Sequence, residues 1–267
     1  MHSRDDERYV EILLNPLKEC KKYKPAFGSN ESEGVSLTSF HTLYARDPLY
    51  HWVGLDDDLM YAAHKAAGGM TSIYRQLGIG CERLLRQIIK DSLVLSAEQV
   101  SWSYKYDKGD GKTAVHTLDA RITTLDITNL ERKEALTSWL ASTSTSLGLI
   151  EQDLKGVVLE IRQGYKSADS KRQNADLRFG LRAYTEAAHL PVIMIVSTQA
   201  SSVVCTRYRA ANILVLTGRL DELDSTFAFF SNVVGYDLAA LFQRNTELLR
   251  DSFREILQAL LSPDGAA

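Results

Sequence analysis

The chain has 267 residues and a formal net charge of −3, and 45% of its residues are hydrophobic, which is ordinary for a soluble globular protein. This composition argues against a protein that coats nucleic acid indiscriminately, but it is compatible with a local basic groove. Three widely spaced cysteines, no apolar run of about 18 residues and a polar N-terminus predict no disulfide framework, no membrane span and no signal peptide, so we expect a cytoplasmic protein.

Helical patterns, with breaks at proline and glycine, cover the first third of the chain. The predicted segments are a helix over 5–24 with a break at Pro16, a polar loop over 28–34, short helices over 36–66 with a break at Pro48, a turn at Gly68-Gly69, and a helix over 71–92. We therefore expect residues 1–70 to form a helical N-terminal region packed on a core of residues 71–267, both in one structural domain.

Strand and helix patterns alternate along the rest of the chain. The predicted segments are a hairpin of strands 99–106 and 113–123, an inserted helix 129–147, a strand 155–163, a helix 170–188, a strand 192–196, a helix 201–210, a strand 213–216 and a long helix 236–261. In the first strand, Trp102, Tyr104 and Tyr106 share one face, because side chains alternate along a strand. This order predicts an α/β fold with a mixed central sheet flanked by helices.

Several familiar motifs are incomplete in this sequence. Gly111-Lys112-Thr113 resembles the end of a phosphate-binding loop, but Tyr106 stands where that motif needs a glycine, so we interpret the run as a hairpin turn. Gly78 and Gly80 lie inside a predicted helix, where glycine costs about 1 kcal/mol, so we expect another backbone or a phosphate close to them. The six histidines lack metal-binding spacing and are interpreted as structural or surface residues.

The most informative stretch is 155–182, which carries seven Lys/Arg against three Asp/Glu in a chain that is acidic overall. Its buried strand pattern ends at Glu160, and Arg162 shares a strand face with that carboxylate. Asp119 lies on the strand predicted to precede Glu160. Since two carboxylates with phosphate oxygens and water can hold Mg²⁺, adjacent strands would bring these acids together as a metal site.

The strand order, with Asp119 on one strand and Glu160-x-Arg162 on the next, resembles the PD-(D/E)XK nuclease superfamily. Four longer runs resemble the ApaLI-like type II restriction endonucleases: AAHKAAGGMTSIYRQLGIGCERL (62–84), LDARI (118–122), EIRQGYKSADSKRQNAD (160–176) and GYDLAALFQRN (235–245). The resemblance spans roughly residues 40–260. It implies a nuclease-like core sheet and Mg²⁺-dependent hydrolysis of double-stranded DNA at a short palindromic site, usually by a homodimer.

The resemblance also implies roles for individual residues. Asp119 and Glu160 match the two metal-binding acids, and Glu82 matches an auxiliary acid that some members carry. Two departures from the motif stand out: Leu118 precedes Asp119 in place of proline, and Arg162 replaces the motif lysine.

Arginine is a permanent cation and a poor proton acceptor. Either Arg162 acts electrostatically, or Lys166 or Lys171 has taken over the role of the motif lysine. Asp169-Ser170-Lys171 also fits the D-x-K pattern, at a predicted helix start.

Polar residues around the start of that helix are candidates for contacts with DNA bases, since arginine pairs well with guanine and asparagine or glutamine with adenine. They are Gln163, Arg172, Gln173, Asn174 and Arg178. A solvated helix face is the alternative for them. For the whole chain, the alternative function is a non-catalytic DNA-binding or regulatory α/β module with a degenerate site, which Arg162 in place of lysine favours.

Overall fold

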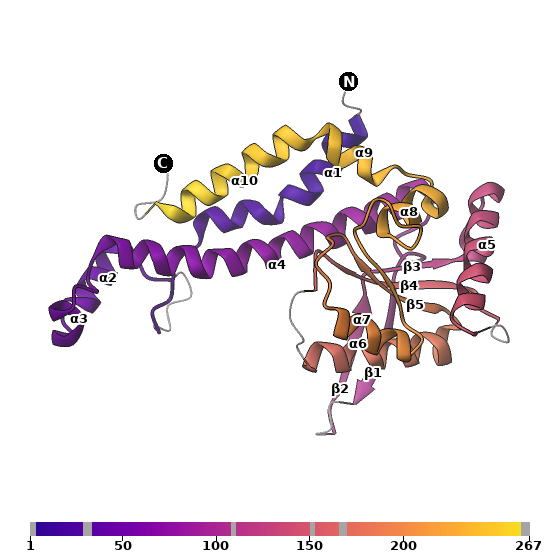
Figure 1. Cartoon of the computed structure of the whole chain (residues 1–267), viewed down its shortest axis with the longest axis horizontal. Helices are drawn as coiled ribbons and strands as arrows, with labels where there is room; N and C mark the ends of the chain where they lie inside the picture. Colours follow the sequence, from indigo (N-terminus) through magenta and orange to yellow (C-terminus); the bar gives the residue numbers. More distant parts are fainter. Residues whose placement is uncertain (1–3, 29–33, 108–110, 150–152, 166–169, 263–267) are drawn as a thin grey trace. The chain divides into compact units, whose positions relative to one another are not determined.

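The computed structural model describes residues 4–28, 34–107, 111–149, 153–165 and 170–262 (Figure 1). Lys166, Asp169 and most of the predicted loop 28–34 lie outside these residues. The chain divides into two compact units, residues 1–80 with 244–267, and residues 81–243. This division differs from the predicted one, because the C-terminal helix groups with the N-terminal region. Of the helices that the structure describes, none is both long and apolar enough to cross a membrane.

The first unit is helical, as predicted. It contains α1 (Arg4–Leu14), the 3-10 helix η1 (Pro16–Lys22), α2 (Leu37–Tyr44), α3 (Pro48–Trp52), the first part of α4 (Asp58–Ser92) and α10 (Thr246–Leu261). The predicted break at Pro48 is present: α2 ends before this residue, and Pro48 begins α3. The Asp47 side chain caps α3 by accepting from the amides of Leu49 and Tyr50.

Glycines in α4 mark close packing within the first unit. The predicted turn at Gly68-Gly69 is wrong, because both residues lie in the middle of α4. A β-carbon at Gly68 would collide with the ring of Tyr23, just after η1. A β-carbon at Gly80 would collide with the main-chain carbonyl of Leu13 in α1, which confirms the expected close approach of another backbone.

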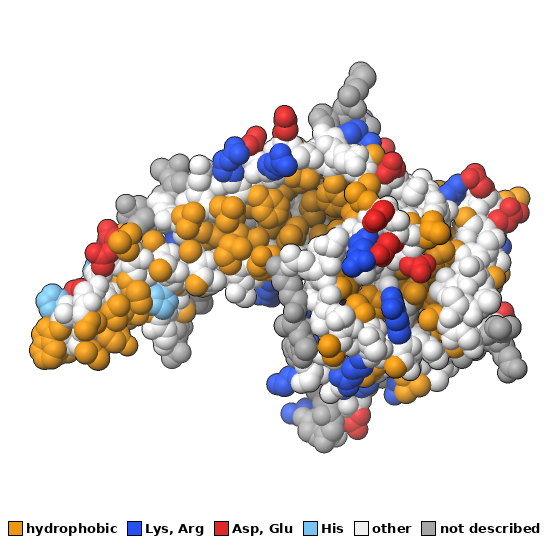
Figure 2. Space-filling view, in the orientation of Figure 1, with side chains coloured by type: hydrophobic (Ala, Val, Ile, Leu, Met, Phe, Trp, Pro, Cys, Tyr) orange, Lys and Arg blue, Asp and Glu red, His pale blue; other side chains and the backbone are white. Residues whose placement is uncertain are grey.

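Large hydrophobic side chains are also exposed on the first unit. Leu49, Trp52, Val53 and Leu59, in and around α3, are exposed, and Trp52 is 80% accessible to solvent. In Figure 2 hydrophobic side chains gather over the end of this unit that carries α2 and α3. Exposed apolar side chains in such number are typical of surfaces that contact other molecules.

The second unit is built on a four-stranded mixed sheet, and the predicted α/β class with a mixed sheet is confirmed. Its order is β3 (Ala120–Thr123), β4 (Gly156–Arg162), β5 (Leu190–Ile195) and β6 (Leu214–Leu216), with β3 antiparallel to β4 and the other neighbours parallel. Every residue of β5 is buried, as its continuous apolar pattern predicts.

Helices cover this sheet. α5 (Leu130–Ser146), α6 (Ser170–Arg182) and α7 (Ser202–Ala210) match three predicted helices within a few residues. On one face of the sheet, Phe179 of α6 and Val204 of α7 pack with Val158 and Ile193 of the central strands in one apolar cluster. This packing carries the polar residues of α6 toward the end of β4.

The predicted hairpin is present but its second strand is divided. β1 (Trp102–Asp107) and β2 (Thr113–Leu118) form a separate antiparallel pair, with Tyr104 opposite His116. The rest of the predicted return strand is β3, which pairs with β4 instead. The prediction that Asp119 lies inside a strand is therefore wrong. It lies between β2 and β3, where the chain passes from one sheet to the other.

The predicted helix 236–261 is two helices. Asn245 is buried, has a non-helical backbone, and separates α9 (Leu238–Arg244) from α10. In α10 two residues of the predicted apolar stripe, Leu248 and Leu257, are exposed rather than buried. The boundary between the two units falls at this break.

Candidate functional site

Asp119 is hydrogen bonded to main-chain groups near the end of β4. Its amide donates to the carbonyl of Leu159 at 3.1 Å, and its carboxylate Oδ2 accepts from the amide of Ile161 at 2.6 Å. The side chain is 14% exposed. The Asp119 carboxylate therefore contacts β4 at the residue directly after Glu160, as expected if the two acids share one site.

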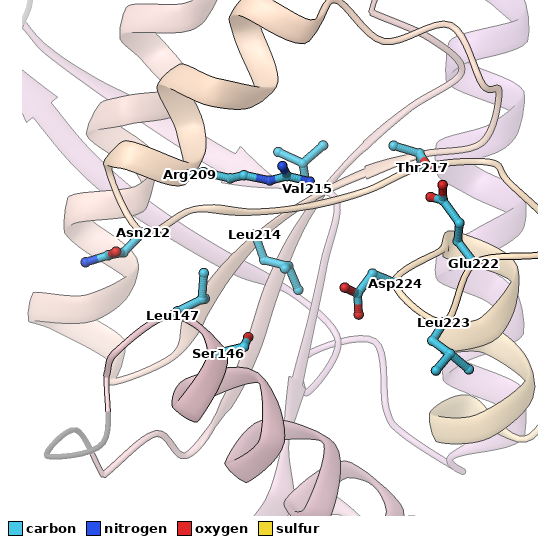
Figure 3. Close-up of a pocket in the computed structure, with 10 residues that line it drawn as sticks. All are labelled: Ser146, Leu147, Arg209, Asn212, Leu214, Val215, Thr217, Glu222, Leu223 and Asp224. Carbon is cyan, nitrogen blue, oxygen red and sulfur yellow. The ribbon is translucent and has the colours of Figure 1, made fainter.

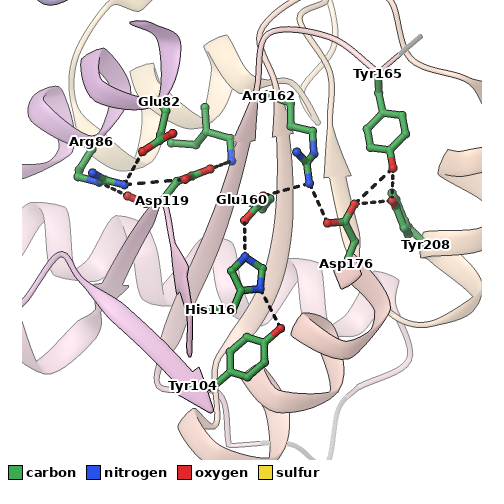
Figure 4. A network of polar contacts seen from close by, with 11 residues as sticks. Glu82, Arg86, Tyr104, His116, Asp119, Glu160, Arg162, Tyr165, Asp176 and Tyr208 are labelled. Atoms are coloured by element: carbon green, nitrogen blue, oxygen red, sulfur yellow. Dashed lines mark hydrogen bonds and ion pairs between the residues drawn. The ribbon is translucent and has the colours of Figure 1, made fainter. Parts of the chain in front are cut away.

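Glu82, the predicted auxiliary acid, lies beside Asp119 (Figure 4). Arg86, one turn later on α4, donates from Nη2 to Glu82 Oε1 at 2.9 Å, and this nitrogen is 3.8 Å from Asp119 Oδ1. The Nε of Arg86 donates to the main-chain carbonyl of Asp119. We call Glu82, Arg86 and Asp119 the Arg86 cluster. Arg86 itself was not predicted.

Glu160 and Arg162 share one face of β4, as predicted, and Arg162 contacts two acids. Its Nη2 lies 3.0 Å from Glu160 Oε1 and donates to Asp176 Oδ1 of α6 at 2.8 Å. Asp176 was not predicted, and its side chain is 1% exposed. We call Glu160, Arg162 and Asp176 the Arg162 cluster.

Two buried tyrosines complete the surroundings of Asp176. The hydroxyl of Tyr208 donates to Asp176 Oδ2 at 2.6 Å, and the hydroxyl oxygen of Tyr165 lies 3.5 Å from the same oxygen. The two hydroxyls are 2.8 Å apart and hydrogen bond to each other. Burial and the bond to Asp176 raise the pKa of Tyr208, so this hydroxyl keeps its proton.

His116 also lies beside Glu160, which the interpretation of the histidines as structural or surface residues did not anticipate. Its Nε2 is 3.9 Å from Glu160 Oε2, and its Nδ1 is 3.0 Å from the hydroxyl of Tyr104, its partner across the β1–β2 pair. Burial lowers the pKa of His116, which favours the neutral ring near pH 7. The ring therefore adds little positive charge to the site.

The two central acids carry more negative charge than their surroundings balance. Burial raises the pKa of Asp119, and the charges of Glu160 and Glu82 raise it further. Burial likewise raises the pKa of Glu160, although Arg162 opposes this effect. Glu160 Oε2 is buried and has no hydrogen-bond partner among the residues that the structure describes. Such an oxygen is costly unless a donor or a cation satisfies it.

A divalent cation fits this arrangement by charge. Each cluster holds two carboxyl groups and one guanidinium group, so the two clusters together carry two excess negative charges when all four acids are ionised. In the described part of the chain no group of three His, Cys, Asp or Glu side chains is arranged to hold a metal ion. A Mg²⁺ ion held by two protein carboxylates would take its other ligands from water and substrate oxygens.

The other candidate cations lie toward α6. Lys171 and Arg172 are exposed at the start of this helix, and the charge of Arg172 lowers the pKa of Glu160. Lys166 falls outside the described residues, so its place relative to Glu160 is left open.

The candidate base-contacting residues differ in what they contact. Gln173 is buried, and its side-chain oxygen accepts from Arg207 Nη1 of α7 at 2.8 Å, so we withdraw it as a candidate for base contacts. The side-chain oxygen of Asn174 accepts from Arg207 Nη2 at 3.0 Å, although this residue is exposed. The Arg178 guanidinium lies over the ring of Tyr106, 5.2 Å from its centroid, and Gln163 is half-buried after β4.

A separate pocket of about 630 Å³ opens beside β6 (Figure 3). Leu214 and Val215 of β6 line it together with Arg209 of α7 and the acids Glu222 and Asp224. None of the predicted site residues lines this pocket, so it does not bear on the arrangement around Glu160.

Models of known protein families, curated proteins and solved structures gave no match to this chain. The function therefore has to be argued from the geometry around Asp119 and Glu160 and from the sequence resemblance.

Proposed function

We propose that the protein is a Mg²⁺-dependent type II restriction endonuclease with a PD-(D/E)XK nuclease-like core, which hydrolyses double-stranded DNA at a short palindromic site. One observation carries the proposal: two largely buried carboxyl groups with raised pKa values lie at the end of β4, and one of them has an oxygen without a hydrogen-bond donor among the described residues. Perturbed acids of this kind are typical of functional sites. The resemblance supplies the substrate class and the family.

Asp119 and Glu160 would hold the metal. When bound, Mg²⁺ would stabilise charge on the phosphodiester and lower the pKa of an attacking water molecule. Arg162 is fixed against Glu160 and stays charged, so it serves as an electrostatic group and not as a proton acceptor. Lys166 and Lys171 stay candidates for a cation that faces the phosphate.

DNA would be held by the basic residues of α6, of which Lys171, Arg172 and Arg178 are exposed. A homodimer would place two such sites across a palindrome, since a two-fold pair of subunits matches the symmetry of the DNA. The exposed apolar side chains around α3 are candidates for the subunit contact. Light scattering of the free protein tests this state, and a strict monomer that stays monomeric on DNA would contradict it.

The test of the proposed function is incubation of the purified protein with phage DNA, with and without Mg²⁺. Discrete fragments that appear only with the metal are the expected result. If a dimer neutralises about 6–10 phosphates, its affinity for DNA should also fall roughly 10³- to 10⁵-fold between about 50 and 200 mM salt. Tight, salt-dependent binding without any cleavage would favour the alternative, a DNA-binding module with a degenerate site. The replacement of the motif lysine by Arg162 is the observation that favours this alternative.

A further inference from the structure

Arg162 is shared between two acids in an unusual way. A single nitrogen, Nη2, contacts both Glu160 Oε1 and Asp176 Oδ1. Arginine and a carboxylate usually pair through two parallel hydrogen bonds, which would occupy both oxygens of Glu160. Here only one Glu160 oxygen contacts Arg162, and the other, Oε2, has no hydrogen-bond donor among the described residues.

Asp176 explains why Arg162 does not take both oxygens. It is almost fully buried on α6, so its charge has to be balanced within the protein, and Arg162 provides that balance. Its second oxygen accepts from Tyr208. Both carboxylate oxygens of Asp176 are thus bonded, and the group cannot turn away from Arg162 without losing a buried hydrogen bond.

The guanidinium is restrained on another side as well. Its central carbon lies 5.6 Å from the centroid of the Tyr165 ring, and the Tyr165 hydroxyl is bonded to Tyr208. The Arg162 side chain is only 14% exposed. Arg162 is therefore held between α6 and β4 and does not reach freely toward solvent or toward both oxygens of Glu160.

We propose that Asp176 is a positioning residue of the site, which draws Arg162 away from a two-oxygen pair with Glu160 and so keeps Glu160 Oε2 available for the metal ion. This inference rests on the proposed metal-dependent function. Without the charge of Asp176, Arg162 pairs with both oxygens of Glu160 and competes with the cation. Asp176 itself touches neither metal nor DNA.

A double-mutant cycle tests this role. The four proteins are wild type, Asp176→Asn, Arg162→Gln and the double variant, each measured for kcat on DNA and for Mg²⁺ binding to the metal-free protein by calorimetry. Asparagine keeps the shape of Asp176 and one acceptor oxygen, which Tyr208 can still use, but it removes the charge and replaces the acceptor of Arg162 by an NH2 donor. We expect Asp176→Asn to weaken Mg²⁺ binding and lower kcat, each roughly 10- to 100-fold, with KM for DNA unchanged. In the Arg162→Gln background, Asp176→Asn should weaken Mg²⁺ binding and lower kcat further by less than about twofold.

The cycle separates this role from a merely structural one. A structural role predicts equal losses in both backgrounds, and that result would overturn the inference, as would an unchanged kcat and Mg²⁺ affinity in Asp176→Asn. If the wild type binds Mg²⁺ but cuts no DNA, the nuclease proposal fails while the calorimetric cycle still decides the inference. If the wild type neither binds Mg²⁺ nor cuts DNA, both fail.

A second variant covers the case in which Asp176→Asn does not fold. Tyr208→Phe removes the hydrogen bond that keeps the Asp176 carboxylate from turning away from Arg162, so we expect the same two losses at roughly 2- to 10-fold. Tyr184→Phe is the matched control, because it removes a hydrogen bond of 2.6 Å to the carbonyl of Asn212, outside the Arg162 cluster. Equal behaviour of the two tyrosine variants would contradict the inference.

Discussion

The two arginine clusters contain the same groups and hold them differently. In the Arg86 cluster the arginine side chain is 35% exposed and pairs with Glu82, its neighbour one turn away on the same helix. In the Arg162 cluster the arginine side chain is 14% exposed, and its acidic partners on the same strand and on α6 are 12% and 1% exposed. Arg86 also contacts a second element, because its Nε donates to the main-chain carbonyl of Asp119, but water screens its half-exposed ion pair more than the buried pairs of Arg162. The site thus combines a half-exposed cation with a buried one.

The largest expected effect comes from Asp119 and Glu160, the acids that would bind the metal ion in the proposed function. Asp119→Asn and Glu160→Gln should each lower the rate of DNA cleavage roughly 10³-fold or more, because the bound metal contributes several kcal/mol to the transition state. Binding of DNA should change little, since its phosphate contacts come from other residues. Rates from plasmid cleavage and affinities from gel shifts measure both quantities.

Glu131→Gln is the matched control, because this carboxylate on α5 is 77% exposed and lies outside both clusters. Full cleavage by Asp119→Asn and Glu160→Gln would remove both acids from the mechanism.

The next largest effect is on the free energy of unfolding, which should fall more when Arg162 is replaced than when Arg86 is replaced. Arg162→Gln leaves Asp176 buried without a counter-charge, which should lower the free energy of unfolding by about 3–5 kcal/mol. Arg86→Gln breaks a half-exposed pair and should cost at most about 1 kcal/mol. Urea unfolding of both variants gives the comparison. Similar costs would mean that burial does not distinguish the two arginines.

The cations should also differ in their effect on catalysis. Arg162→Ala should lower kcat roughly 100-fold, and Arg86→Ala roughly 10-fold, because water screens the charge of the more buried arginine less, so this charge stabilises a transition state more. Lys166→Ala and Lys171→Ala decide whether a lysine shares this role. Arg219→Ala, which breaks an exposed pair with Glu222, is the control. Normal cleavage by all four variants would make the charge-stabilisation account wrong.

How far the sequence could predict this site depends on the range of each signal. Glu160 and Arg162 were predictable, because a buried strand pattern ends beside them and strand periodicity fixes their shared face. Asp119 was placed in the right region but in the wrong element. Leu118, Ala120 and Ile122 alternate with polar residues on both sides of the junction, so the change of pairing partner from β1 to β4 leaves no mark in the local pattern.

Asp176, His116 and Arg86 were missed for a related reason. Asp176 stands in a polar helical run and is buried only because α6 packs across the sheet onto Arg162. His116 occupies an ordinary strand position, and its contact with Glu160 arises between two separate sheets. Such contacts depend on tertiary packing, and neither composition nor periodicity reports them.

The smallest expected effect is on thermal stability, and it connects the excess charge of the two clusters to the metal. The folded-state pKa values of Asp119 and Glu160 are raised above their unfolded values. The stability that the protonated acids contribute is therefore present at low pH and is lost as the pH rises through the raised values. Mg²⁺ should restore the lost stability at pH values where the acids are ionised. The metal should therefore raise Tm at about pH 9 and change Tm little at about pH 5. Each 1 kcal/mol of stability regained corresponds to a rise in Tm of about 2–4 °C. Asp119→Asn should raise Tm without metal at the higher pH and abolish the Mg²⁺ effect, because it removes one of the two repelling charges. An equal Mg²⁺ shift at both pH values, or in Asp119→Asn, would place metal binding elsewhere on the protein.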